Sequence, residues 1–142
     1  MDQADKRRME DLLRKNRRRK LVPGIVQKWA GRGIAASPLS DERQRQLLGE
    51  LRAWDTSEYR PVVDVQVAIC EFLEGPSLVV VVGFDVNEEP ALLVPAHALS
   101  ASEQDLRAMY PDGFVLIREE AALIIDFEED CGRVNVSYAT AC

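Results

Sequence analysis

Apolar residues recur with two different periods along this chain of 142 residues, and the two periods predict its elements. Met9, Leu12 and Leu13 stand at helical spacing among charged residues, which predicts an amphipathic helix over residues 3–20 with a narrow apolar stripe. Pro23 and Gly24 are expected to end this helix. The glycines that follow weaken any long helix, so a linker with one short helical turn is predicted up to residue 38.

A second helical pattern begins at Ser40, a residue type that often caps the N-terminus of a helix. The carboxylates of Asp41 and Glu42 would then lie at the positive end of the helix dipole. Large apolar residues recur on one face of this helix, which should dock on the body of the protein: Leu47, Leu48, Leu51 and Trp54.

From Val62 onward the apolar period changes from 3.6 to 2. The alternation over residues 62–70 predicts a strand with one buried face, and Cys70 at its end is expected to be a small buried hydrophobe. Residues 78–84 are apolar at successive positions, which is typical of a central strand. A third strand is predicted over residues 91–94.

The last third of the chain predicts one helix followed by three strands. Ser100 and Glu103 form a capping box for the helix, which ends at a Pro-Asp-Gly turn. The strands are expected over residues 114–117, 122–128 and 134–138, with a hairpin turn at residues 130–133.

This order lacks the regular alternation of strand and helix of a doubly wound fold. It predicts an α+β fold: a mainly antiparallel sheet of about six strands, two to three helices and an N-terminal basic helix. The length suits one domain. We divide it into a basic amphipathic helical arm (residues 1–22), a linker (23–38) and an α+β body (39–142).

Charge divides the chain in the same way. Residues 1–20 hold nine of the 18 lysines and arginines, but only four of the 24 aspartates and glutamates. The other residues hold nine bases and 20 acids, so the net charge of −6 conceals a basic arm on an acidic body. The basic run at residues 17–20 is a candidate binding site for phosphates, nucleic acid or an acidic membrane surface. A solvated helix that folds back onto the acidic body is the alternative, and nucleic acid is expected only through residues 1–20.

Acidic residues gather between residues 119 and 130, where no basic residue occurs. On a strand, Asp126, Glu128 and Asp130 would project to one exposed face, with Ile125 and Phe127 inward. A solvated sheet face, a docking surface for a basic partner, and a metal or catalytic site are the three interpretations. Calcium-loop spacing and a His or Cys cluster are both missing, so no metal, cofactor or catalytic residue is predicted. The predicted partner-binding residues are Glu119, Glu120, Asp126, Glu128, Glu129 and Asp130.

His97 is the only histidine, and no nucleophile or carboxylate stands at a recognisable spacing from it. Cys70, Cys131 and Cys142 are too few for a disulfide framework, and nothing in the sequence supports a bridge between the last two. The longest apolar run is too short to span a bilayer, and the N-terminus lacks the apolar segment of a secretory signal. We therefore expect a cytoplasmic protein.

Residues 110–117 and 123–129 resemble small acidic bacterial immunity proteins that neutralise secreted toxins. The resemblance implies a stoichiometric inhibitor, not an enzyme, whose acidic body binds a basic toxin or effector. Residues 41–128 are also similar in element order to secretion chaperones, which bind effectors but end in a helix. An enzyme that uses His97 is the third class. We expect a cytoplasmic protein-interaction module.

Overall fold

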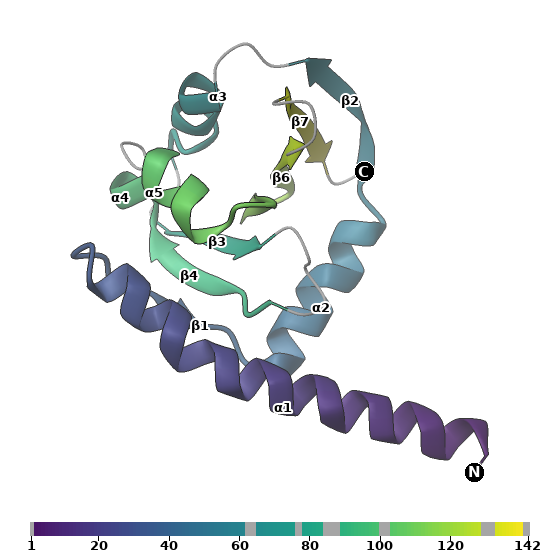
Figure 1. Cartoon of the computed structure of the whole chain (residues 1–142). Helices are drawn as coiled ribbons and strands as arrows, with labels where there is room; N and C mark the ends of the chain where they lie inside the picture. The colour runs from purple at the N-terminus through teal and green to yellow at the C-terminus, as the bar shows by residue number, and fades with distance from the viewer. Residues whose placement is uncertain are drawn as a thin grey trace.

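A computed structural model describes residues 2–61, 65–75, 78–83, 89–99, 103–128 and 133–140. It shows an α+β fold in which a sheet lies between helices, and the N-terminal helix extends beyond the rest of the molecule (Figure 1). In chain order the elements are α1 (Gln3–Ala30), β1 (Ser37–Pro38), α2 (Asp41–Arg52), β2 (Asp55–Pro61), α3 (Val65–Phe72), β3 (Leu78–Gly83), β4 (Leu92–Pro95), α4 (Ala96–Leu99), α5 (Glu103–Met109), β5 (Gly113–Arg118), β6 (Ala121–Glu128) and β7 (Arg133–Thr140).

The described strands form one sheet in the order β1-β4-β3-β5-β6-β7-β2, and every neighbouring pair is antiparallel. β1 contributes only two residues, so six strands carry the sheet. The predicted fold class is confirmed. Gly113 at the start of β5 has φ +125°, and a Cβ there would lie 2.2 Å from the carbonyl oxygen of Ile125. Only glycine allows β5 and β6 to approach so closely at this point.

The two faces of the sheet bury two separate apolar clusters, because side chains alternate along each strand. On β5, Phe114 and Leu116 join the larger cluster, whereas Val115 and Ile117 join the smaller one. Side chains of α3, α4, α5 and the C-terminal part of α1 complete the larger cluster, and Leu47 of α2 belongs to the smaller one. The site described below lies on the α2 face.

The predicted end of the first helix at Pro23 is wrong. α1 runs on through Pro23 and Gly24 to Ala30, and the fully buried Trp29 anchors its last turn in the larger cluster. Residues 23–30 of the predicted linker are therefore helical. A proline inside a helix costs about 3 kcal/mol, and the burial of a large apolar side chain contributes about 1.5–3 kcal/mol. Burial of Trp29 at the end of α1 therefore offsets much of the free energy that Pro23 costs inside the helix.

The strand predicted over residues 62–70 is also wrong, because residues 65–72 form helix α3. Its buried residues, Ala68, Ile69 and Phe72, follow helical spacing, and Val67 just before them is 50% exposed. A run this rich in apolar residues fits both periods. Cys70 is half-buried, and its Sγ accepts a hydrogen bond from Nε2 of Gln66 at 3.3 Å.

Other predicted elements are confirmed within small shifts of their ends. Ser40 caps α2, where its hydroxyl oxygen accepts a hydrogen bond from the backbone N–H of Arg43 at 3.1 Å. β3, β4, α5, β5, β6 and β7 all occur where strands and a helix were predicted. β1, β2 and α4 were not predicted. Ser100 and residues 130–132 of the predicted hairpin turn lie outside the described residues.

Candidate binding groove

An open groove of about 730 Å³ separates α2 from one part of the sheet. Its floor consists of apolar side chains on the face of the smaller cluster, from β3, β4 and β5: Leu78, Val80, Leu93 and Ile117. Leu78 is 51% exposed, and Val80 and Leu93 are half-buried. This face of the sheet is therefore only partly covered, and apolar surface remains open to solvent.

One side of α2 forms the wall of the groove. Arg43, Leu47 and Glu50 follow one another at helical spacing, and Trp54 continues the same face just beyond the helix. The sequence predicted that this apolar face docks on the body, which is confirmed. The opening beside it was missed, because no pattern in the sequence shows how much of a sheet one helix covers.

The rim of the groove is acidic. Glu50, Glu119 and Glu120 are exposed and line it, and Arg43 is the exposed base on the same rim. Arg118 also borders the groove, but its guanidinium is held on the other face of the sheet. There Nη1 donates to the Phe72 carbonyl oxygen at 2.8 Å, and the guanidinium carbon stands 4.8 Å from the centre of the Phe72 ring.

Glu119 and Glu120 occupy the turn between β5 and β6. Glu120 has φ +61°, a left-handed backbone conformation that residues other than glycine and asparagine rarely adopt. The turn thus holds two carboxylates at the edge of the groove at some cost in backbone strain.

Of the six acidic residues predicted to bind a partner, the side chains of Glu119, Glu120 and Asp126 are described, and these three do not lie together. Asp126 lies at the opposite end of the β5–β6 hairpin from Glu120, about 20 Å away at the usual rise per strand residue. The predicted inward direction of Ile125 and Phe127 is confirmed, but Asp126 is half-buried instead of exposed, because this second face of β6 also packs. The side chain of Glu128 and the residues Glu129 and Asp130 lie outside what the structure describes.

His97 lies on the opposite side of the sheet from the groove. It is exposed on α4, whose neighbours Ala96 and Leu99 belong to the larger cluster on the other side of the sheet. Among the residues that the structure describes, no group of three or more His, Cys, Asp or Glu side chains could hold a metal ion.

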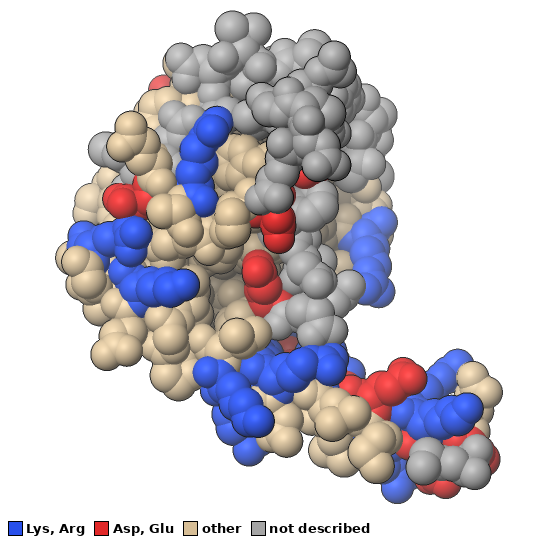
Figure 2. Space-filling view, viewed as in Figure 1, with Lys and Arg blue, Asp and Glu red and all other residues tan. Residues whose placement is uncertain are grey.

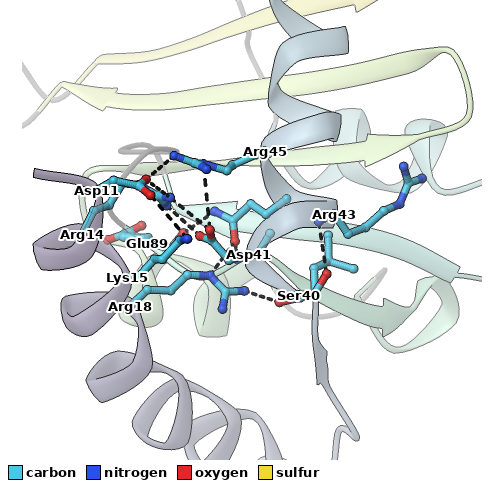
Figure 3. A network of polar contacts seen from close by, with 12 residues as sticks. Asp11, Arg14, Lys15, Arg18, Ser40, Asp41, Arg43, Arg45 and Glu89 are labelled. Carbon is cyan, nitrogen blue, oxygen red and sulfur yellow. Dashed lines mark hydrogen bonds and ion pairs between the residues drawn. The ribbon is translucent and has the colours of Figure 1, made fainter. Parts of the chain in front are cut away.

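A polar network fixes α1 against α2 beside this site (Figure 3). Nη1 and Nη2 of Arg14 donate to the two carboxylate oxygens of Asp41 at 2.8 and 3.1 Å, a bidentate pair that lowers the pKa of the Asp41 carboxyl. Asp11 accepts from Arg14 at 3.1 Å and also pairs with Arg45 of α2. These contacts link two turns of α1 to the first half of α2.

The buried side chain of Gln44 extends the network into the body. Its Oε1 accepts hydrogen bonds from Nε of Arg18 at 3.1 Å and from the backbone N–H of Ala91 at 2.9 Å. Its Nε2 donates to the Glu89 carbonyl oxygen at 2.8 Å. Because Gln44 is only 3% exposed, these bonds are made away from water, and α1 has a defined orientation on the body.

The sequence matches no protein-family model, no curated protein and no solved structure. Within the described residues, no helix is long and apolar enough to cross a membrane.

Proposed function

We propose that the protein is a binding module that takes a basic, amphipathic segment of a partner protein into the groove between α2 and the sheet. An immunity-type inhibitor would engage a basic toxin or effector in this way. The observation that carries the proposal is an apolar floor beneath an acidic rim: the half-exposed Leu78 lies below the carboxylates of Glu50, Glu119 and Glu120.

The two parts of the groove would have different roles. Apolar surface that stays exposed in a folded protein commonly marks an interaction site, and its burial would supply most of the affinity. Carboxylates on the rim would attract a cationic segment over several ångströms and fix its orientation. Two of the residues predicted from the sequence, Glu119 and Glu120, belong to this rim.

The alternative classes differ in testable ways. A secretion chaperone would use the same groove, but it would hold the effector for export instead of neutralising it. An enzyme that uses His97 would work on the opposite side of the sheet, so changes in the groove would leave its activity intact.

The test replaces both turn carboxylates by lysine, in Glu119→Lys with Glu120→Lys. The probe is a synthetic amphipathic helix of leucine and lysine, titrated into the full chain by fluorescence anisotropy. We expect association to slow and the affinity to fall by about tenfold or more at low salt, with a smaller effect at high salt because screening is stronger.

The matched control reverses two exposed acids away from the groove, in Glu71→Lys with Asp112→Lys, and changes the net charge equally. It should bind the probe like the wild type. Equal losses in both double variants would show attraction by net charge alone and would refute the groove. Leu78→Asp provides the apolar counterpart and should also weaken binding, even at high salt.

A further inference from the structure

The basic residues of α1 fall into two groups with different surroundings. Nη1 of Arg14 donates to Oδ1 of Asp41 at 2.8 Å, and Nε of Arg18 donates to Oε1 of Gln44 at 3.1 Å, so these two arginines hold the helix on the body. Six other basic residues within residues 2–20 are exposed, against three exposed acids (Asp2, Asp5 and Glu10): Lys6, Arg7, Arg8, Arg17, Arg19 and Lys20. Folding back onto the acidic body therefore accounts for only part of the positive charge.

Four of the exposed bases form two rows along the helix. Arg8 and Arg19 are eleven residues apart, which is about three turns at 3.6 residues per turn, so they lie in line on one side of α1. Lys6 and Arg17 have the same spacing and form a second row. Positions 6 and 8 differ by about 200° around a helix, which places the two rows on nearly opposite sides. Each row spans about 17 Å at 1.5 Å per residue.

The surface of α1 between the two rows is open to solvent. Leu12 lies there and is 57% exposed, whereas Arg14 and Arg18 contact the body from the opposite face of the helix. α1 also extends beyond the rest of the molecule (Figure 1). Figure 2 shows Lys and Arg side chains at the projecting end of α1 and where α1 meets the body, with acidic side chains among them. A large partner could therefore reach both rows without meeting the body.

Bases on two opposite sides of a helix match a channel with negative walls. The major groove of B-DNA is about 12 Å wide and has phosphates along both walls, and an α-helix with its side chains is about 10–12 Å across. A membrane surface would instead require a long apolar face on the helix. The large apolar residues of this face lie within residues 9–13, and the exposed Asn16 follows them, so the apolar surface is short.

We propose that α1 lies in the major groove of duplex DNA and binds the phosphates of both strands. Arg8 and Arg19 contact one strand, and Lys6 and Arg17 contact the other. Because these contacts are made to the backbone, the binding is independent of base sequence. The remainder of the chain after residue 20 holds 20 of the 24 acidic residues, and its body lies on the side of α1 away from the DNA. The groove between α2 and the sheet takes no part.

Fluorescence anisotropy of a labelled short DNA duplex, titrated with the full chain over a salt series, tests the contact. Four phosphate contacts predict that the logarithm of the binding constant falls against the logarithm of salt concentration with a slope of about −4. Arg8→Gln with Arg19→Gln should reduce this slope by about half and weaken binding at low salt by about tenfold or more. Lys6→Gln with Arg17→Gln should do the same. An effect of one row alone would contradict the contact with two strands.

The matched control removes the same charge from another helix. Arg43→Gln with Arg52→Gln changes two exposed arginines of α2 and should bind the duplex like the wild type. Glu10→Gln removes an exposed acid from α1 and should strengthen binding at low salt, because repulsion of the phosphates is lost. Circular dichroism confirms that each variant keeps its helices. Equal losses in the α1 and α2 double variants would show attraction by net charge and would refute the proposal.

Other anionic probes separate the major groove from general attraction. The major groove of duplex RNA is too narrow for a helix, so duplex RNA should bind more weakly than DNA, and equal affinity would overturn the proposal. Met9→Gln with Leu12→Gln keeps the charge of α1 and should leave DNA affinity unchanged. Binding to vesicles of anionic lipid that this variant abolishes, without binding to DNA, would assign the helix to a membrane surface instead. Absence of DNA binding at low salt would also overturn the proposal.

Discussion

Tyr110 shows at the scale of one residue how burial sets the chemistry of a side chain. It is 4% exposed and lies in a row of rings, 6.5 Å from Trp29 and 6.3 Å from Phe114 between ring centres. Burial raises the pKa of Tyr110 to about 12, although Nε1 of Trp29 donates a hydrogen bond to its hydroxyl oxygen at 3.4 Å. The sequence predicts that this tyrosine follows a helix, but it does not show that Trp29 of α1 packs against it.

The raised pKa predicts a loss of stability in alkaline solution. The tyrosine is neutral in both states below its unfolded pKa of about 10, so its contribution is fully present there. Between pH 10 and 12 only the unfolded state ionises, and about 2–3 kcal/mol of stability should be lost. Urea unfolding across this pH range measures it. Tyr110→Phe should flatten the dependence, and an equally steep curve in that variant would assign the loss to other groups.

At the scale of elements, local signals were reliable where one pattern dominated. The cap at Ser40 was found because serine is a common N-cap residue, and the strands β5 and β6 were found because short apolar runs there are bounded by polar turn residues. Local sequence signals failed where tertiary packing determines the secondary structure. Helix α3 was missed because its apolar run fits two periods, and the second half of α1 was missed because Pro23 and Gly24 oppose a helix that Trp29 anchors.

The continuous helix α1 makes a prediction about Pro23. Proline lacks the N–H that would bond the carbonyl oxygen four residues earlier, and Pro23 is exposed. Pro23→Ala should therefore raise the free energy of unfolding by about 1–3 kcal/mol, measured by urea denaturation. A neutral or destabilising effect would mean that the helix is interrupted at this point, as the sequence had suggested.

At the scale of the whole molecule, composition predicted a basic arm on an acidic body, and the structure shows how the two are joined. Part of the positive charge of α1 is used within the molecule, where Arg14 and Arg18 hold the helix to α2 and Gln44. The candidate site could be predicted only in part. Glu119 and Glu120 were identified, but the groove itself arises from α2 and three strands that lie far apart in sequence.

NMR of the full chain during binding shows which residues contact the basic segment. Uniformly ¹⁵N-labelled protein is titrated with the leucine–lysine helix and followed by two-dimensional NMR. If the groove binds the segment, chemical shifts should change only at Leu78, Val80, Leu93, Glu119 and the indole N–H of Trp54, and those of α3 and α4 should stay unchanged. Shifts centred on His97 and the opposite side of the sheet, or none at all, would contradict binding in the groove.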